Sequence, residues 1–339
     1  MKITIYIQTD SKDFVQDLDW PEKHPLGGSE TAALRLTKAL IAQGEDVNLI
    51  TNPEELSGCP CDIFISVRQW RIFAAGIYPG KRNYLWCHDD VDRPMVKPLE
   101  DPQLAKPIYE RLDGVLVLSH YQAQRWMDAL NLPLNKIIKI SNGIPVQLFK
   151  PQPEKLAGRK PWAYYSSTPF RGLEILLMAW PHIQNAIPEA QLHVFSSMQI
   201  YYPDQRQDEY AHLYAKAKSL PNVHYHGSVG QAELRSVAQK CRVLAYPCIF
   251  PETSCITAME AMAAGCVVVS TALGALPETA WQNPLVPIAE GWGQQWMLEV
   301  MKILQDNRSY EQKALQNIAV AKYYDWNRVA QNLIHELGK

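Results

Sequence analysis

Short runs of apolar, often β-branched residues alternate with helix-like segments along the whole 339-residue chain. Most of these runs, such as "DIFISV" (62–67) and "CVVVS" (266–270), are almost continuously apolar instead of alternating between apolar and polar residues. That pattern is typical of strands that are buried on both faces, as the strands of a parallel sheet are. Because the strands alternate with helices, we predict an α/β fold in which βαβ units form doubly wound parallel sheets.

The candidate strands fall into two groups of similar size. They span residues 2–7, 47–50, 62–67, 83–87, 114–118 and 136–140 in the first half, and 162–166, 191–195, 223–226, 243–246, 266–270 and 285–288 in the second. Between the groups, "LFKPQPEKLAGRKP" (148–161) is rich in proline and basic residues and is predicted to be an exposed linker. We therefore predict one domain over 1–150 and a second over 151–322, followed by a helix within 323–339.

Composition excludes several classes of protein. The formal net charge of −2 does not fit a strongly basic chain built around nucleic acid. No run of about 18 apolar residues is present, and "MKITIYIQTD" is too short and too polar for a signal peptide. The seven cysteines are expected to be reduced thiols, which favours a cytoplasmic protein.

The stretch "PETSCITAMEAMAAGC" (251–266) places two carboxylates eight positions apart. Thr253 or Ser254 is a good helix N-cap and Gly265 a good helix stop, and the segment between them is apolar on nearly all sides. Glu260 lies inside this predicted buried helix, where an unpaired carboxylate would cost several kcal/mol. Glu260 therefore needs a partner, either a basic side chain or the hydroxyl groups of a polyol.

Glu252 precedes this helix at the carboxyl end of a predicted strand, which is the edge where ligands of α/β sheets bind. The backbone N–H groups of Thr253, Ser254 and Cys255 would point the same way and, with the helix dipole, form an anion site. One loop would thus offer an acceptor for hydroxyl groups and a cradle for phosphate, as a nucleotide sugar requires. The alternative is that Glu252 is an ordinary surface acid.

Two more loops carry features typical of phosphate binding. "LGGSE" precedes a predicted helix over 29–43, and the paired glycines Gly27 and Gly28 let backbone N–H groups approach a ligand closely. In "TPFRGLEILL", Arg171 lies near a helix N-terminus, where a cation opposes the helix dipole unless an anion is bound. The alternative for Arg171 is an exposed side chain in solvent.

The segment "LWCHDDVD" (85–92) ends another apolar run. His88 there would orient a sugar or transfer a proton, or would simply cap the end of a strand. Asp90 and Asp92 match the DxD pattern of metal-dependent sugar transferases, but three acids in four positions are commoner in a solvated turn. We favour the turn and predict no metal site.

These motifs together resemble those of a known family. "PETSCITAMEAMAAGCVVVSTALGALPE" resembles the donor-binding stretch of family 4 retaining glycosyltransferases of the GT-B fold, the glycogen-synthase-like and mannosyltransferase-like group. That stretch has two glutamates with seven residues between them, an Ala-Met-Ala-like run, a glycine, a strand, and a loop with Gly and Pro-Glu. Six further segments occur in the same order as in the family, so the resemblance covers nearly the whole chain. They are "GGSE", His88, "SNGI", "RGLEILLMAW", "YHGSV" and "DWNRVA".

The resemblance implies two Rossmann-like domains that face each other across a cleft, with the final helix crossing back to the first domain. It implies a metal-independent hexosyltransferase that moves a sugar from a nucleotide-diphospho-sugar to an unidentified acceptor hydroxyl, with retention of anomeric configuration. The first domain would bind the acceptor and the second the donor.

The resemblance also implies roles for single residues. Glu260 would hold the ribose hydroxyls, Glu252 the hydroxyls of the donor sugar, and His88 would position that sugar. A covalent nucleophile is the alternative role for Glu252. The other donor-binding residues, which would contact the diphosphate or the base, are Gly27, Gly28, Arg171, Thr253, Ser254, Cys255, Gly227 and Val229.

The chain departs from the family at "YSSTPFRG", where Gly-Arg often precedes Lys-Gly. Arg171 replaces the lysine, and Ser166 or Ser167 stands near the missing cation. Thr253 also has a side chain where glycine is common, which leaves open how the donor sugar would fit there.

Three alternative functions stay open. Two of them are enzymes with the same fold, namely a phosphorylase and a sugar-nucleotide epimerase. The third is a non-catalytic nucleotide-sugar-binding subunit. The absence of GxGxxG after a strand disfavours a nicotinamide-dependent oxidoreductase.

The acceptor is not identified by any motif. Basic and aromatic residues of the first domain fit an anionic or lipid-linked acceptor at the inner face of a membrane, or an ordinary solvated surface, which we favour. These residues are Arg68, Trp70, Arg71, Lys81, Arg82, Arg93 and Lys97.

Overall fold

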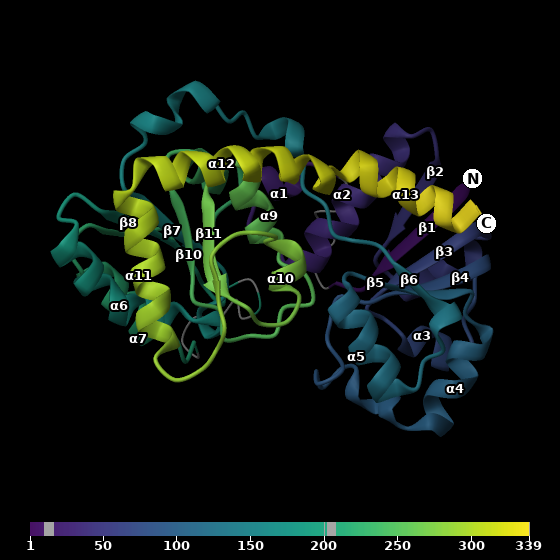
Figure 1. The fold of residues 1–339 in the computed structure, drawn as a ribbon. Helices are drawn as coiled ribbons and strands as arrows, with labels where there is room; N and C mark the ends of the chain where they lie inside the picture. The colour runs from purple at the N-terminus through teal and green to yellow at the C-terminus, as the bar shows by residue number, and fades with distance from the viewer. Residues whose placement is uncertain (10–16, 200, 202–207, 339) are drawn as a thin grey trace. The chain divides into compact units, whose positions relative to one another are not determined.

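A computed structural model describes residues 1–9, 17–199, 201 and 208–338, and the chain divides into two compact units (Figure 1). The first unit comprises Met1–Trp20, Gly27–Ile144 and Tyr324–Lys339. The second comprises Pro21–Leu26 and Pro145–Tyr323. Among the described residues, no helix is both long enough and apolar enough to cross a lipid bilayer.

The first unit contains a parallel six-stranded sheet in the order β2-β1-β3-β4-β5-β6. Its strands are β1 (Lys2–Ile7), β2 (Asp46–Ile50), β3 (Cys61–Val67), β4 (Gly80–Trp86), β5 (Gly114–Val117) and β6 (Ile137–Lys139). Its helices are α2 (Gly28–Ala42), α3 (Arg71–Ala74), α4 (Pro102–Arg111), α5 (His120–Leu130) and α13 (Trp326–Gly338), while α1 (Trp20–Lys23) spans the sequence boundary between the units. Short 3-10 turns complete it at Pro53–Gly58, Lys97–Glu100 and Leu134–Lys136.

The second unit contains another parallel six-stranded sheet, in the order β12-β11-β10-β7-β8-β9. Its strands are β7 (Trp162–Ser166), β8 (Gln191–Phe195), β9 (Val223–Tyr225), β10 (Val243–Tyr246), β11 (Val267–Thr271) and β12 (Leu285–Val286). Its helices are α6 (Leu173–Ala186), α7 (Ala211–Ser219), α8 (Gln231–Ala238), α9 (Ile256–Ala263), α10 (Leu276–Thr279), α11 (Trp292–Gln305) and α12 (Asn307–Ala321). Its 3-10 turns are Val146–Leu148, Pro153–Gly158, Pro169–Arg171 and Lys322–Tyr324.

The prediction of an α/β fold with parallel sheets is confirmed, and each predicted strand is present with ends displaced by at most a few residues. The apolar pattern was a reliable guide because helices cover both faces of each sheet. Every residue of β10 and β11 is buried, as expected for central parallel strands. Gly44, with φ of +87°, follows the end of α2, in agreement with the helix predicted over 29–43.

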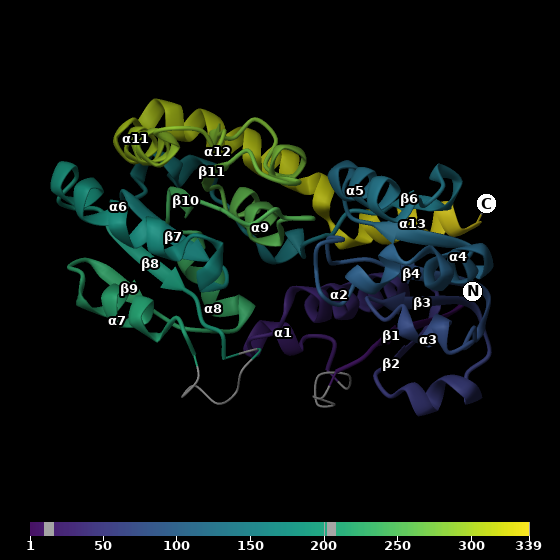
Figure 2. The same cartoon turned by 90° about the horizontal axis from the view of Figure 1, so that it is seen from below.

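The order of strands in the second sheet reverses once. The chain runs from β7 through β8 to β9, and then begins again at β10 on the other side of β7; Figure 2 shows β7 between β8 and β10. The loops that leave β7 and β10 therefore turn to opposite faces, which leaves room for a ligand at the carboxyl ends of these two strands. The corresponding switch point in the first sheet lies between β1 and β3.

The segment 148–161 is only partly the exposed linker that we predicted. Leu156, in the 3-10 turn Pro153–Gly158, is buried. Arg159 donates hydrogen bonds to the carbonyl oxygens of Cys241, Ala264 and Gly265. The segment is thus tied to the second unit because Leu156 is buried and Arg159 finds hydrogen-bond partners there.

The last helix, α13, belongs to the first unit and packs against α2 (Figure 1). A Cβ atom on Gly143 would lie 2.7 Å from the Trp326 ring, so the start of α13 is in close contact with this part of the chain. Leu333 and Leu337 on the helix are buried. The apolar spacing that predicted a helix within 323–339 is therefore its packing face.

Candidate functional site

Glu252 lies in a short loop that follows β10 and returns to the switch point of the second sheet. Two glycines hold the backbone of this loop. Gly172 has φ of +115°, and a Cβ atom there would overlap the carbonyl oxygen of Pro247. Gly274 has φ of +61°, and a Cβ atom there would lie 2.6 Å from both the N and the O atom of Glu252. Both positions require glycine, and together they fix residues 247–252.

The Glu252 side chain is nearly enclosed, since only 5% of the residue is exposed. Its Oε1 atom accepts a 2.5 Å hydrogen bond from the hydroxyl of Tyr246, the last residue of β10. The Nε atom of Arg171, which follows β7, lies 3.6 Å from the same oxygen. Because β7 and β10 are neighbours at the switch point, the topology of the sheet brings this cation and this carboxylate together.

Two aromatic rings and a hydroxyl position Arg171. Its guanidinium carbon lies 4.5 Å from the ring centroid of Phe250 and 5.5 Å from that of Phe170, within the range of cation–π attraction. Its Nη1 atom is 3.4 Å from the hydroxyl oxygen of Ser167. The side chain keeps 28% of its surface exposed, so its fork of N–H donors is accessible to an anionic ligand.

The helix α9 begins later than predicted. Its N-cap is Cys255, without a side-chain hydrogen bond, so the prediction of Thr253 or Ser254 as N-cap is wrong. The reason is that the carbonyl oxygen of Cys255 accepts the first two helical N–H groups, those of Ala258 and Met259. The chain from Glu252 to this point is not helical and bends at Thr253, and cap preference does not override that path.

The other features of α9 agree with the sequence. Glu260 lies inside the helix and is buried, with 6% of the residue exposed. Gly265 follows the helix with φ of +77°, as a helix stop does. Whether the amides of 253–255 meet a phosphate, and whether Glu260 meets ribose, stay predictions.

Several buried side-chain oxygens at the carboxyl edge of this sheet have no hydrogen-bond partner among the described residues. They follow β7 and β8, lie at the end of β11, or lie at the start of α9. They belong to Thr168, Ser196, Ser270, Ser254 and Thr257. Buried polar atoms almost always have a partner, so such a group of atoms at one edge indicates a place where a polar ligand or water completes the bonding.

The residues predicted to hold the base, Gly227 and Val229, lie in the loop after β9. Gly227 has φ of +70°, which suits glycine. Next to it, the His226 ring stacks on the Phe195 ring with centroids 4.3 Å apart. The loop therefore starts from a rigid pair of rings, and the contact of Gly227 and Val229 with a base stays a prediction.

A cluster of histidines extends from this pair into the sheet. The Nδ1 atom of His193 lies 3.1 Å from Nε2 of His226, and the His193 and His224 rings stack at 4.8 Å. Burial, together with these two neighbouring histidines, lowers the pKa of His193 to about 4. His193 is therefore uncharged at neutral pH.

In the first unit, His88 follows β4 at the carboxyl edge of the sheet, as predicted from the sequence. Its ring meets the Trp86 ring edge-on at 4.5 Å. Burial and then the positive charge of Arg68 lower the pKa of His88 to about 3. His88 is thus a neutral imidazole at physiological pH, suited to hydrogen bonding and not to carrying charge.

The glycine pair lies where the sequence placed it. Gly27 is the N-cap of α2 and Gly28 is the first residue of this 15-residue helix. Both follow β1, next to the switch point of the first sheet. Their backbone N–H groups are at a helix N-terminus, and their contact with a diphosphate stays a prediction.

Asp90 and Asp92 are bound by a basic side chain. Arg125 lies 3.4 Å from an Asp90 oxygen and 2.5 Å from an Asp92 oxygen, and the Tyr121 hydroxyl donates to Asp90. Among the residues that the structure describes, no group of three or more His, Cys, Asp or Glu side chains is arranged to hold a metal ion.

Sequence reasoning missed Tyr246 and Cys248 as neighbours of Glu252. Tyr246 ends a buried strand, and a tyrosine there is hard to distinguish from a core aromatic residue. The thiol of Cys248 lies 3.2 Å from the Phe250 carbonyl and 3.9 Å from Oε1 of Glu252. The available signal was position, since both residues precede Glu252 at the ligand edge of the sheet.

Comparison with known proteins gives the class of this second unit. Residues 163–307 match the family model described as "Glycosyl transferases group 1". The chain carries a glycosyltransferase domain. The match includes Arg171, Gly227, Glu252 and Glu260, whereas His88 lies outside the matched residues.

Solved structures extend the likeness to the whole chain. The Anabaena protein HepE in complex with UDP-glucose is 15% identical, with a TM-score of 0.76, and the match covers 100% of this chain and 99% of that one. Sucrose-phosphate synthase from Thermosynechococcus elongatus is 16% identical, with a TM-score of 0.72, over 99% and 98% of the two chains. The catalytic domain of starch synthase IV from Arabidopsis thaliana, bound to ADP and acarbose, is 13% identical, with a TM-score of 0.65, over 99% of this chain and 98% of that domain.

These likenesses confirm the fold as GT-B. No curated protein sequence matches the chain.

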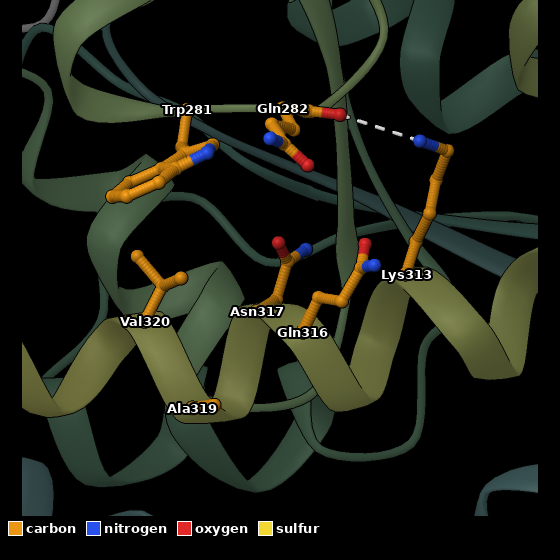
Figure 3. Close-up of a pocket in the computed structure, with 7 residues that line it drawn as sticks. All are labelled: Trp281, Gln282, Lys313, Gln316, Asn317, Ala319 and Val320. Atoms are coloured by element: carbon orange, nitrogen blue, oxygen red, sulfur yellow. Dashed lines mark hydrogen bonds between the residues drawn. The ribbon is translucent and has the colours of Figure 1, made fainter.

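The second unit also has a hollow away from its sheet edge. Figure 3 shows it between Trp281–Gln282 and α12, with Lys313 reaching across to the Gln282 carbonyl oxygen. Its volume is about 240 Å³. None of the predicted site residues lines it, so it is separate from the site around Glu252.

Proposed function

We propose that this protein is a retaining, metal-independent glycosyltransferase that moves a sugar from a nucleotide-diphospho-sugar to an acceptor hydroxyl. The observation that carries the proposal is the Arg171–Glu252 pair at the switch point of the second sheet. Buried hydroxyl groups that have no hydrogen-bond partner among the described residues lie at the same edge. The structures of HepE with UDP-glucose and of starch synthase IV with ADP support a nucleotide-sugar donor.

In this proposal Arg171 stabilises the departing diphosphate. Negative charge develops on the leaving group as the glycosidic bond breaks, and a positioned cation lowers the energy of that state more than that of the bound donor. The fork of Arg171 can donate to two phosphate oxygens, which offsets the missing second cation of the "YSSTPFRG" segment. The backbone amides at the start of α9 and α2 would add further donors.

The two glutamates would hold hydroxyl groups. Glu260 is buried in α9 and would accept hydrogen bonds from ribose, and Glu252 would accept them from the donor sugar. We favour hydroxyl binding by Glu252 with attack on the same face as departure, over a covalent nucleophile. Its Oε1 atom is already engaged by Tyr246, which fits a positioned acceptor. His88, a neutral imidazole, would position the sugar by hydrogen bonding.

The proposal is tested first by binding. UDP-, GDP- and ADP-sugars are screened by thermal shift, because a ligand that binds only the folded state raises the melting temperature. We expect one nucleotide sugar to stabilise the wild-type protein and Arg171→Ala to remove most of that shift. If no nucleotide sugar stabilises the protein, the proposal fails.

Turnover then separates the alternatives. The stabilising donor is incubated with a panel of sugar, lipid-linked and glycan acceptors, and the products are analysed for anomeric configuration. Retained configuration in a transferred sugar supports the proposal. Binding without turnover would favour a non-catalytic subunit, phosphate-dependent turnover a phosphorylase, and isomerisation of the donor an epimerase.

A further inference from the structure

We infer that Tyr246 is a positioning residue that holds one oxygen of the Glu252 carboxylate and leaves the other for the donor sugar. The inference rests on the proposed function, in which Glu252 binds hydroxyl groups of that sugar. It adds to the site a residue that would contact no substrate itself and would act through Glu252.

The first observation is that the contacts of Glu252 are one-sided. The Tyr246 hydroxyl at 2.5 Å, the Arg171 Nε atom at 3.6 Å and the Cys248 thiol at 3.9 Å all approach Oε1. The second carboxylate oxygen, Oε2, has no contact of this kind with the described residues. One oxygen is thus used for anchoring, and the other is available to accept hydrogen bonds from a ligand.

The second observation is the direction of the hydrogen bonds around Tyr246. This side chain is fully buried, and burial raises the pKa of its hydroxyl well above the ordinary value, so the group stays protonated. Its single proton goes to Glu252, because that carboxylate can only accept. The Ser167 hydroxyl, 3.3 Å from the Tyr246 oxygen, must then donate to it.

Three hydrogen bonds and the Arg171–Glu252 ion pair together form a ring of four side chains. Arg171 Nη1 donates to Ser167, Ser167 donates to Tyr246, Tyr246 donates to Glu252, and Oε1 of Glu252 lies beside Arg171 Nε. The three hydrogen bonds run in one direction, from Arg171 to Glu252, and the ion pair closes the ring. The carboxylate that would hold the sugar and the cation that would meet the diphosphate are therefore linked twice, and Tyr246 is one of the links.

The backbone already fixes the position of Glu252, but it does not fix the rotation of its carboxylate. Glycines 172 and 274 hold the loop, whereas the terminal torsion of a glutamate is soft. A short hydrogen bond to one oxygen removes that freedom. Without it, the carboxylate would turn toward Arg171 and be less often aligned with the sugar, which lowers the rate more than the affinity for the nucleotide.

The test compares Tyr246→Phe with a matched control, Tyr164→Phe. Tyr164 lies on the neighbouring strand β7, is also fully buried, and its hydroxyl has no hydrogen-bond partner among the described residues. Both changes delete one buried hydroxyl and keep the ring. Only Tyr246→Phe removes the anchor of Glu252.

Three quantities are measured for each protein: the melting temperature, the affinity for UDP and the turnover of UDP-glucose. If the screen returns another donor, that donor and its nucleoside diphosphate replace them. We expect Tyr246→Phe to lower kcat by about 10- to 100-fold, the range typical for loss of a hydrogen bond to a charged group. Its affinity for the nucleoside diphosphate, which has no sugar, should stay within about twofold of wild type, and Tyr164→Phe should match wild type throughout.

Two results would overturn the inference while leaving the proposed function intact: wild-type turnover in Tyr246→Phe, or an equal loss in nucleoside diphosphate affinity and kcat. The second result would mark a merely structural role. If the wild-type protein binds no nucleotide sugar, the proposed function fails instead. Should Tyr246→Phe not fold, Ser167→Ala serves, since it breaks the same ring; a kcat equal to wild type there would contradict the inference.

Discussion

Gly274→Ala should reduce turnover without unfolding the protein. Gly274 has φ of +61°, a region in which an L-residue pays about 1–2 kcal/mol. Its new Cβ atom would lie 2.6 Å from the N and O atoms of Glu252, and contacts under 3.0 Å essentially never occur. The backbone at Glu252 must therefore move by about 0.4 Å or more.

The displacement also strains the hydrogen bond that the Ala275 N–H donates to the Glu252 carbonyl oxygen at 2.7 Å, which contributes about 1 kcal/mol. Since a shift of about 1 Å can cost 100-fold in rate, we expect kcat of Gly274→Ala to fall about tenfold or more. The total loss of stability should be about 2–3 kcal/mol.

Gly291→Ala is the matched control. Gly291 has a similar φ of +75°, but a Cβ atom there would have no atom of the described residues within 4 Å. It should cost only the conformational penalty, about 1–2 kcal/mol, and leave kcat unchanged. The free energy of unfolding is measured by urea titration and kcat with the donor found in the screen. Equal kcat in the two variants would refute the argument that Gly274 fixes the catalytic loop.

Other expected outcomes concern charge and pH. Glu252→Ala and Arg171→Ala should each lower kcat at least about tenfold, measured as initial rates of sugar transfer, and unchanged rates in both would contradict the assignment of the site. Because the pKa of His88 is about 3, this side chain should not ionise near pH 6.5. The pH dependence of the rate near pH 6.5 should therefore be the same in the wild type and in His88→Gln. The pKa of His193 is about 4 in the folded protein and about 6.5 in the unfolded protein, so the unfolded state takes up a proton first as the pH falls. The contribution of His193 to the free energy of unfolding is therefore fully present above pH 6.5 and is lost as the pH falls toward 4. Urea midpoints should therefore show a loss of up to about 2 kcal/mol from pH 7 to pH 5 that shrinks in His193→Asn. EDTA should leave transfer unchanged, and full inhibition that added metal restores would disprove the metal-independent mechanism.

The sheets were predictable because their strands are buried on both faces, and such strands are nearly continuous apolar runs in the sequence. "VVVST" and "VLAY" contain few polar residues because helices cover both sides of β11 and β10. The location of Glu252 and Arg171 followed from the same rule, since both residues lie in the connections that follow strands ending at the ligand edge.

The details of the site were less accessible because they depend on contacts between distant segments. Arg125 pairs with Asp90, which lies 35 positions earlier in the sequence, and no local pattern around "DDVD" predicts this ion pair. Ser254 has a strong preference for helix N-caps, but the path of the chain from Glu252 placed the cap at Cys255. The sequence pattern indicates a core residue at Tyr246 because its ring is buried in the core. Only its hydroxyl group takes part in the site.

The placement of α13 has a consequence for how the protein is made. The first unit lacks its last helix until Tyr324–Gly338 leaves the ribosome, after every residue of the second unit has been synthesised. Until then the surface of α2 that packs against α13 is exposed to solvent, where a chaperone can bind it. The second unit is thus the first that can finish folding during translation, although its main segment starts only at Pro145.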